Sequence, residues 1–568
     1  MINLKDKPFY LSDEDINWVN ETLSKMTTKE KVGQLFCLVV SKEDVSQLLQ
    51  ELKNLDMKPC GFMQRPFMAE KAQENSRILQ ESFDIPLLIA ANLERGGNGI
   101  AIDGTNYASQ LEVAATDDEE MAYRLGVIAG REGRTIGCNW AFAPVIDIDY
   151  NFNNPITNTR TYGSDPNRVL RLARAYMKGI QENGLAVSIK HWPGDGVDGR
   201  DQHLVASVNS LSTEEWDKTY GYVYKGMIDE GAETVMSAHI LQPAYSRLLR
   251  PGIKDEDIMP ASLAPELNID LLRGKLGFNG LIVTDATSMA GFAVAMPREL
   301  AVPTSIAAGC DMFLFTMNLE EDFNFMLKGV EKGIITEERL NEAVTRILAL
   351  KARLRLHIKQ KEGNLVPDKS ALSVIKCEEH ERWARECADK AVTLVKDTQK
   401  LLPISPEKHK KVLLYILGDI GGYMDDSKGI NGYFIKLLEQ NGFEITKYDY
   451  SNTDFSVMNR PISFFKNFDL IVYFASLKTQ SNQTVVRINW AQPMGSDVPK
   501  FVKEVPTLFI SVDNPYHLQD VPMVKTFING YNSSEYVVEA VVEKILGRSE
   551  FKGINPVDPF CGYWDATL

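Results

Sequence analysis

The sequence predicts a (β/α)8 TIM-type barrel followed by a smaller three-layer α/β sandwich domain. Three observations carry this prediction. Apolar runs of strand length alternate with helical stretches through the first part of the chain, and their number is the eight that closes a barrel. A polar stretch with helix breakers, 357–373, then interrupts the pattern, and further strand-like runs follow it. A doubly wound sheet remains the alternative for the first part.

The eight predicted barrel strands are short runs rich in apolar residues: 35–40, 60–63, 86–91, 139–143, 185–190, 233–238, 281–284 and 311–315. Between them, three residue pairs have capping-box spacing and predict helix starts: Thr27 with Glu30, Thr116 with Glu119, and Ser212 with Glu215. A helix is expected near 337–356, where apolar residues recur on one face. These are Leu340, Ala343, Val344, Ile347 and Leu348.

These elements predict three segments. Residues 1–356 form the barrel, 357–410 are a linker with a helix, and 411–568 form the sandwich domain. The strands of the last segment are predicted from the runs KVLLYIL at 411, FEITKYDY at 443, FDLIVYFA at 468, TLFISVD at 507 and KTFING at 525. No internal repeat and no low-complexity tract interrupts this pattern.

Composition excludes several classes of partner. The 568 residues are 44% hydrophobic and carry a net charge of -15, which argues against nucleic acid or an anionic membrane as partner. No basic, apolar leader starts the sequence and no run of about eighteen apolar residues occurs, so we expect a cytoplasmic protein. The seven cysteines form no CxxC pair. The sequence therefore predicts no disulfide framework, no metal site and no cofactor, and it leaves the oligomeric state open.

Polar residues stand where the predicted strands end, which is where active sites of this fold gather. These residues are Asn92 and Glu94 after the third strand, Asp147 and Arg160 after the fourth, Lys190 and His191 at the fifth, His239 at the sixth and Asp285 at the seventh. An aspartate closing the run LIVTD would be partly desolvated, and Lys190 or Arg160 could keep it ionised. It could then attack a sugar anomeric carbon, although a strand-end aspartate can also be a helix cap.

The loop that follows the fifth strand, SIKHWPGDGVDGRDQH, is the densest group of titratable residues in the chain. Glycines at 194, 196 and 199 let its backbone bend between Lys190 and the pair Asp201 and His203. That pair could equally be a surface contact on a polar turn, and His239 could be a packed core histidine. We expect Asp195 and Asp198 to solvate the loop.

These segments resemble glycoside hydrolase family 3. The KHWPGDG loop ending in Asp201-Gln202-His203 is similar to the KH(F/W)PGxG loop and D-(S/T)-H dyad of the β-N-acetylglucosaminidase branch, the peptidoglycan-recycling type. The segments IVTDATSM and PASLAPELNIDLLRGKLGFNG resemble the nucleophile segment and its lead-in. FAPVIDI, the Arg-Thr-Tyr-Gly segment at 160, AGCDM, AVTLVKDTQKLLPI and VDNPYHL extend the resemblance over most of the chain.

The resemblance implies the roles of single residues. Asp285 is expected to be the nucleophile of a retaining mechanism, His203 the general acid/base, and Asp201 the residue that holds its imidazole. Lys190, His191 and Arg160 are expected to bind the sugar hydroxyls, with Asn92, Glu94 and His239 as further substrate-binding residues. Two departures from the branch are visible: Asn92-Leu93-Glu94-Arg95-Gly96-Gly97 stands where DQEGG is usual, and Gln202 replaces the small hydroxyl residue of the dyad.

The function expected from the sequence is an exo-acting β-N-acetylglucosaminidase that removes a terminal GlcNAc-type sugar from a glycoside or cell-wall fragment with water as acceptor. A phosphorylase using the same intermediate is the first alternative, because an imidazole acid/base repels phosphate less than a carboxylate. Another family 3 β-glycosidase, such as a β-glucosidase, is the second. A catalytically silent sugar-binding protein is the third.

Overall fold

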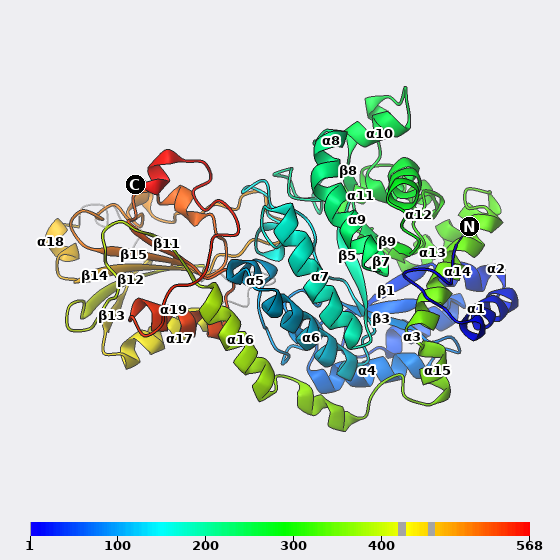
Figure 1. Cartoon of the computed structure of the whole chain (residues 1–568), viewed down its shortest axis with the longest axis horizontal. Coiled ribbons are helices and arrows are strands. Elements are labelled where there is room, and N and C mark those ends of the chain that lie inside the picture. The colour runs from blue at the N-terminus through cyan, green and yellow to red at the C-terminus, as the bar shows by residue number, and fades with distance from the viewer. Residues whose placement is uncertain (1, 419–427, 452–459) are drawn as a thin grey trace. The chain divides into compact units, whose positions relative to one another are not determined.

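The computed structural model describes residues 2–418, 428–451 and 460–568, and its chain falls into two compact units (Figure 1). The first comprises residues 1–107, 122–157 and 166–380. The second comprises 108–121, 158–165 and 381–568, so two short segments from the first half of the chain group with its C-terminal part. Each unit is described by itself.

The first unit contains the predicted barrel sheet. Its strands, all parallel, are β1 (Phe36–Val40), β2 (Gly61–Gln64), β3 (Leu88–Ala91), β4 (Trp140–Ala141), β5 (Ala186–Trp192), β7 (Thr234–Ser237), β9 (Leu281–Thr284) and β10 (Phe313–Leu314). They run in the order β10-β1-β2-β3-β4-β5-β7-β9, and a parallel bridge from Val283 to Met312 nearly closes the ring. The barrel prediction is confirmed, and the doubly wound alternative is wrong.

Helices accompany the barrel strands along the chain. Those of the first unit are α1 (Asp13–Lys25), α2 (Thr28–Gln34), α3 (Ser46–Leu55), α4 (Ala69–Glu81), α6 (Glu119–Ile136), α7 (Pro166–Glu182), α8 (Thr213–Trp216), α9 (Tyr222–Asp229), α10 (Pro243–Leu249), α11 (Ala290–Ala293), α12 (Arg298–Ala307), α13 (Leu319–Glu331), α14 (Glu337–Arg353) and α15 (Leu356–Lys361). All five apolar residues predicted on one face of α14 are buried.

Two of the three predicted helix starts are confirmed as reciprocal capping boxes, at Thr27 with Glu30 and at Ser212 with Glu215. The third is wrong. Thr116 is the last residue of α5 (Gln110–Thr116), and its hydroxyl donates to the carbonyl of Val113 at 2.7 Å. The backbone amide of Glu120 instead bonds the carboxylate of Asp118 at 3.0 Å.

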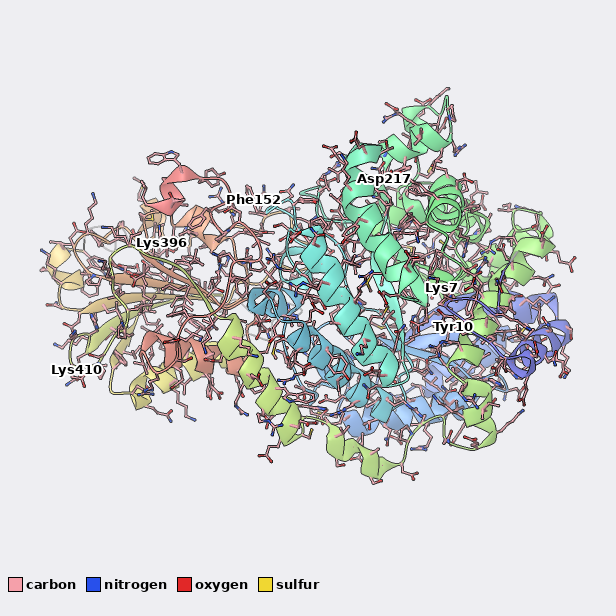
Figure 2. All side chains as sticks on the ribbon, viewed as in Figure 1. Lys7, Tyr10, Phe152, Asp217, Lys396 and Lys410 are labelled. Atoms are coloured by element: carbon pink, nitrogen blue, oxygen red, sulfur yellow. The ribbon has the colours of Figure 1, made fainter. Side chains whose placement is uncertain are left out.

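The helical layer also contains two π-helical segments, η3 (Asp217–Gly221) and η6 (Glu266–Lys275). The ammonium of Lys275 binds the carboxylate of Asp217, a residue labelled in Figure 2, at 2.5 Å and so joins the two segments. A small parallel sheet pairs β6 (Ser207–Val208), which lies between β5 and β7 in sequence, with β8 (Ile240–Leu241), which lies between β7 and β9. Because β6 follows the loop after β5 and β8 follows His239, this pairing fixes the end of that loop.

The second unit is built on a mixed six-stranded sheet in the order β11-β16-β15-β14-β12-β13. Its strands are β11 (Thr393–Asp397), β12 (Lys411–Leu417), β13 (Glu444–Lys447), β14 (Leu470–Ala475), β15 (Thr507–Ser511) and β16 (Thr526–Asn529), accompanied by α16 (Glu378–Ala391), α17 (Lys428–Gln440), α18 (Ile462–Phe465) and α19 (Glu535–Ile545). The five predicted strands of this domain are all present. The sixth, β11, pairs antiparallel with β16 and was not predicted.

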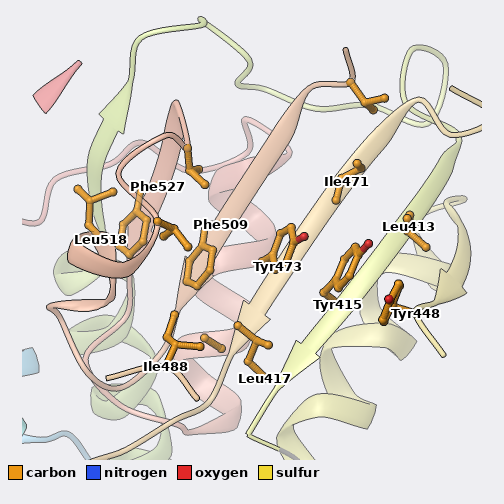
Figure 3. Close-up of a cluster of buried hydrophobic side chains, with 14 of the residues drawn as sticks. Leu413, Tyr415, Leu417, Tyr448, Ile471, Tyr473, Ile488, Phe509, Leu518 and Phe527 are labelled. Carbon is orange, nitrogen blue, oxygen red and sulfur yellow. The ribbon is translucent and has the colours of Figure 1, made fainter. Parts of the chain in front are cut away.

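The two faces of this sheet are packed by aromatic rings. On one face, Tyr415, Tyr473, Phe509 and Phe527 come from four adjacent strands and stack across them, with ring centroids 4.3, 5.8 and 5.0 Å apart in turn (Figure 3). On the other face, Phe474 of β14 stacks on Phe434 of α17 at 4.3 Å. Neighbouring residues of a strand point to opposite faces, and every residue of β14 is buried, so both faces of the sheet are covered there.

Among the described residues, no helix is both long and apolar enough to cross a membrane.

Candidate active site

The carboxyl ends of the barrel strands bring most of the predicted site residues to one rim of the first unit. Lys190 and His191 lie within β5, near its end, and Asp285 directly follows β9. His239 comes two residues after β7, and Asn92 directly follows β3. The strand-end positions predicted from the sequence are therefore the positions observed.

Both the main chain and the side chain of Asp285 are held by hydrogen bonds to backbone groups. Its amide donates to the carbonyl of Ser237 at the end of β7, at 2.7 Å, and its Oδ1 accepts the amide of Ala286, also at 2.7 Å. Burial raises the pKa of Asp285, but His191, His239 and His203, together with the Ala286 amide, outweigh it and leave the pKa below its ordinary value. The carboxylate is therefore ionised and half-buried.

The side chains that lower the pKa of Asp285 are histidines, His191 first, whereas the sequence pointed to Lys190 or Arg160. His191 is held by a carboxylate that the sequence analysis placed at a strand end but gave no role. The fully buried carboxylate of Asp147 accepts two hydrogen bonds from His191, one from its backbone amide at 3.0 Å and one from its ring Nδ1 at 2.6 Å. Because a carboxylate only accepts, Nδ1 carries a proton and the ring orientation is set.

Lys190 connects β5 to the segment after β3. Its ammonium binds the carboxylate of Glu94 at 2.6 Å and donates to the side-chain oxygen of Asn92 at 3.4 Å. The lysine is nearly buried and Glu94 mostly so, which strengthens the ion pair relative to one in water. The structure thus joins three residues that the sequence had assigned separately to sugar binding.

Asp201 and His203 form the predicted pair. Oδ1 of Asp201 accepts Nδ1 of His203 at 2.7 Å and also accepts the backbone amide of His203 at 2.8 Å. The Asp201 side chain is fully buried behind the imidazole, whereas His203 keeps 30% of its side chain exposed. Since Nδ1 donates to the carboxylate, Nε2 is the ring nitrogen left for proton transfer. The alternative of a surface contact on a polar turn does not fit this burial.

Gln202, the residue inside the dyad, is fully buried and ties the loop down. Its Oε1 accepts the backbone amide of His239 at 3.1 Å, and its Nε2 donates to Asp195 at 3.5 Å. A small hydroxyl side chain at this position could not span both contacts. The departure from the family branch therefore coincides with a bridge between the acid/base loop and the segment after β7.

The expectation that Asp195 and Asp198 solvate the loop is wrong. Asp195 is 2% exposed, and its Oδ1 accepts the side-chain amide of Asn154 at 2.8 Å and the amide of Gly196 at 2.7 Å. Asp198 accepts the amide of Val208 at 2.9 Å and pairs with Arg200 at 2.7 Å. Both carboxylates organise the loop from within, because its turns leave backbone amides that need acceptors.

For His239 the structure favours the packed alternative. The residue is fully buried, Nε2 lies 3.0 Å from the carbonyl of Ala286, and Nδ1 lies 2.9 Å from the hydroxyl of Ser262. A carbonyl only accepts, so Nε2 carries the proton and Nδ1 accepts from Ser262. Burial, the main cause, lowers the pKa of His239. Both ring nitrogens are engaged by protein atoms, so this side chain positions the nucleophile segment.

A second support of the nucleophile segment was missed by the sequence analysis. Arg298 binds the buried carboxylate of Asp322 through two nitrogens, at 2.7 and 2.6 Å. Its third nitrogen donates to the carbonyl of Thr287, two residues after Asp285, at 2.9 Å. Nothing in the local pattern around Arg298 signals this contact, because its partners lie in other elements.

Arg160 differs from the other predicted site residues because it does not belong to the first unit. It ends η2 (Asn158–Arg160), which groups with the second unit. Its contact with a sugar stays a prediction. Among the described residues, no group of three or more histidine, cysteine, aspartate or glutamate side chains could hold a metal ion.

Comparison with known proteins identifies the family to which this chain belongs. The family model described as the glycosyl hydrolase family 3 N terminal domain matches residues 24–350, more than half of the chain. The chain belongs to glycoside hydrolase family 3. The resemblance drawn from the loop and the nucleophile segment is thereby confirmed, and the protein is an enzyme of this family with a carbohydrate substrate.

Individual family 3 relatives differ in their described activity. A Cellulomonas fimi protein described as a β-N-acetylglucosaminidase/β-glucosidase is 48% identical over 570 residues, covering all of both chains. The solved structure of the β-glucoside phosphorylase BglX is similar with a TM-score of 0.92 and 49% identity over 99% of each chain. A family 3 β-N-acetylglucosaminidase from a Paenibacillus species has a TM-score of 0.78 at 25% identity, covering 94% of this chain and 99% of its own.

Proposed function

We propose that this protein is a retaining β-glycosidase-type enzyme that transfers a terminal β-linked glucosyl or N-acetylglucosaminyl unit from an alcohol to inorganic phosphate. Asp285 attacks the anomeric carbon, the glycosidic C–O bond breaks, and His203 gives its Nε2 proton to the leaving oxygen. A phosphate oxygen then attacks the same carbon, Asp285 leaves, and the phosphate proton returns to His203. Two inversions leave the product, a glycosyl 1-phosphate, in the original β configuration.

The state of Asp285 supports its role as nucleophile. A lowered pKa keeps the carboxylate ionised at neutral pH, and its fixed backbone holds the attacking oxygen in place. His191, oriented by Asp147, and Lys190, paired with Glu94, lie on β5, which β7 separates from β9, and supply donors for sugar hydroxyls. These side chains are our candidates for binding the sugar ring, with Asn92, Glu94 and Arg160 as further candidates.

The single observation that carries phosphate as acceptor is the identity and surroundings of the acid/base. Once His203 has protonated the leaving group it is neutral, whereas a carboxylic acid in the same role would become an anion and repel phosphate. The nearest negative charge, on Asp201, is fully buried behind the ring. An incoming phosphate therefore meets a neutral imidazole. The 49% identity to a β-glucoside phosphorylase supports the same choice of acceptor.

Hydrolysis of β-N-acetylglucosaminides is the second candidate, because the same intermediate can react with water and because the Cellulomonas fimi relative is described by glycosidase names. In that case His203 deprotonates the water instead. A cell-wall fragment as substrate and a cytoplasmic location stay predictions from the sequence. A catalytically silent sugar-binding role would require that Asp285 and His203 serve no chemistry.

The test is a product assay on 4-nitrophenyl β-glucoside and β-N-acetylglucosaminide with phosphate, with sulfate at equal ionic strength, and with neither. We expect a sugar 1-phosphate, detected by ³¹P NMR, as the main product in phosphate, and much slower release of free sugar in sulfate. Free sugar at equal rates in all three buffers would overturn the phosphorylase and support the hydrolase. The ratio of rates on the two substrates identifies the sugar.

A further inference from the structure

The segments that carry the acid and the nucleophile are fastened together just beyond their catalytic residues. The amide of Ala290 donates to the carbonyl of His203 at 3.0 Å, and the amide of Gly291 donates to the carbonyl of Gln202 at 3.3 Å. A side chain at Gly291 would come within 2.6 Å of that carbonyl, so the two segments are in close contact. Residues 204–206 and 290–296 therefore border one another.

This border is apolar and exposed. Leu204 and Val205, which directly follow His203, are 36% and 39% exposed, and Val294, one turn after Ala290, is 69% exposed. Residues 204–206 are Leu-Val-Ala, and no charged residue occurs from 286 to 297. Single exposed aliphatic side chains are ordinary, but these three lie on the two hydrogen-bonded segments that carry the catalytic residues, where a bound ligand can cover them.

The position of the border relative to the chemistry identifies what covers it. The proton of His203 goes to the glycosidic oxygen, so the rest of the leaving group lies beside His203. The residues that directly follow His203 are the nearest to it in the chain, and the segment at 290–291 is hydrogen-bonded beside them. The border is therefore continuous with the leaving-group side of the site.

We propose that Leu204, Val205 and Val294 form an apolar leaving-group subsite, and that the substrate's leaving group is an alcohol with an apolar alkyl or aryl body. This inference rests on the proposed function, because it places the leaving group by His203. It disfavours a leaving group with carboxylates, such as a peptide-bearing cell-wall fragment. Such a group would lose hydration against the uncharged runs 204–206 and 286–297.

The subsite predicts a chain-length dependence. Burying one methylene is worth a factor of about four at full burial, so kcat/KM should rise about two- to fourfold for each added CH2 on a half-open surface, until the border is covered. The series is methyl, ethyl, butyl and hexyl β-glycosides of the preferred sugar, assayed in phosphate. A series that stays flat in the wild-type protein would overturn the proposal.

Two variants and one control locate the effect. Leu204→Ser and Val294→Ser should each reduce the rise per CH2 to less than half on a logarithmic scale. Leu248→Ser removes an aliphatic side chain of similar exposure, 58%, from α10 and should keep the wild-type slope. An unchanged slope in both subsite variants, or an equal loss in the control, would contradict the assignment of these residues.

A third measurement separates this inference from the proposed function and needs no variant. The leaving group of a 2,4-dinitrophenyl glycoside, 2,4-dinitrophenolate, departs without being protonated. Cleavage of this substrate therefore reports the nucleophile alone. If it is not cleaved, the proposed function fails. If it is cleaved, butanol and hexanol are compared as acceptors that intercept the intermediate, and hexanol should be at least fourfold better. Equal capture of the two alcohols would overturn the apolar subsite while leaving the proposed function in place.

Discussion

The nucleophile and the acid/base of this site are positioned by different means. Asp285 follows a buried strand, and the barrel sheet itself places it, through a backbone bond to β7. His203 lies on a loop, and side chains place it: Asp201 behind the ring and Gln202 across to His239. The barrel thus fixes one catalytic group with main-chain bonds, while the other depends on a few replaceable side chains. Substitutions around the two groups should therefore have different consequences.

The largest effect is expected at the nucleophile. Asp285→Ala removes the attacking group while the sheet stays intact, and kcat should fall at least about 10⁴-fold on every substrate. Added azide should restore turnover by attacking once from the face that Asp285 occupied, giving the α-glycosyl azide by NMR. Asp198→Ala, a matched carboxylate on the acid/base loop, should lose far less. A β-glycosyl azide from Asp285→Ala would contradict the role of this residue.

At the acid/base the loss should depend on the substrate. His203→Ala should reduce kcat/KM about 10²- to 10⁴-fold for alkyl glycosides, which need protonation of the leaving oxygen, and only a few-fold for 2,4-dinitrophenyl glycosides. With azide it should give the β-glycosyl azide, because the intermediate on Asp285 still forms. The two variants should thus give glycosyl azides of opposite anomeric configuration, which distinguishes the nucleophile from the acid/base. Equal loss on all leaving groups would remove His203 from the acid role.

A smaller effect is expected from the loop's anchor. Gln202→Ser abolishes the bridge to His239 and Asp195 and should lower kcat about tenfold for alkyl glycosides, with KM changed less than threefold. The loss should follow leaving-group basicity in the same direction as His203→Ala. A uniform loss on activated and unactivated glycosides would mean that Gln202 supports the fold without positioning the acid.

The smallest effect concerns pH. Burial lowers the pKa of His239 below its ordinary value of 6.5, so the unfolded chain takes up this proton first as the pH falls. The stability that neutral His239 provides is complete above about pH 6.5 and is lost as the pH falls through the lower folded pKa. His239→Gln should therefore reduce the loss of Tm between pH 7.5 and 5.5 by on the order of 1–2 °C. An identical loss in both proteins would contradict the pKa direction.

The sequence predicted what depends on local pattern. Every barrel strand and the placement of Asp285, Lys190 and His191 at strand ends followed from apolar runs, and the Asp201–His203 pair was implied by the family resemblance of one loop. The misses depend on contacts between distant segments. Strand β11 pairs with β16 across more than a hundred residues, and Asp195 is buried by Asn154 from another loop. No local periodicity reports such contacts, and the same holds for Arg298 and Asp322.

The most direct test is to trap the intermediate with a 2-deoxy-2-fluoro-β-glycosyl fluoride and then to follow its release with and without phosphate. The fluorine at C2 slows both steps, so the glycosyl-enzyme accumulates and its attachment site can be read by peptide mass spectrometry. We predict a single label on Asp285 and a release rate that rises with phosphate concentration, giving the 2-fluoro sugar 1-phosphate. A label on another residue, or release at the same rate in sulfate, would contradict the proposed chemistry.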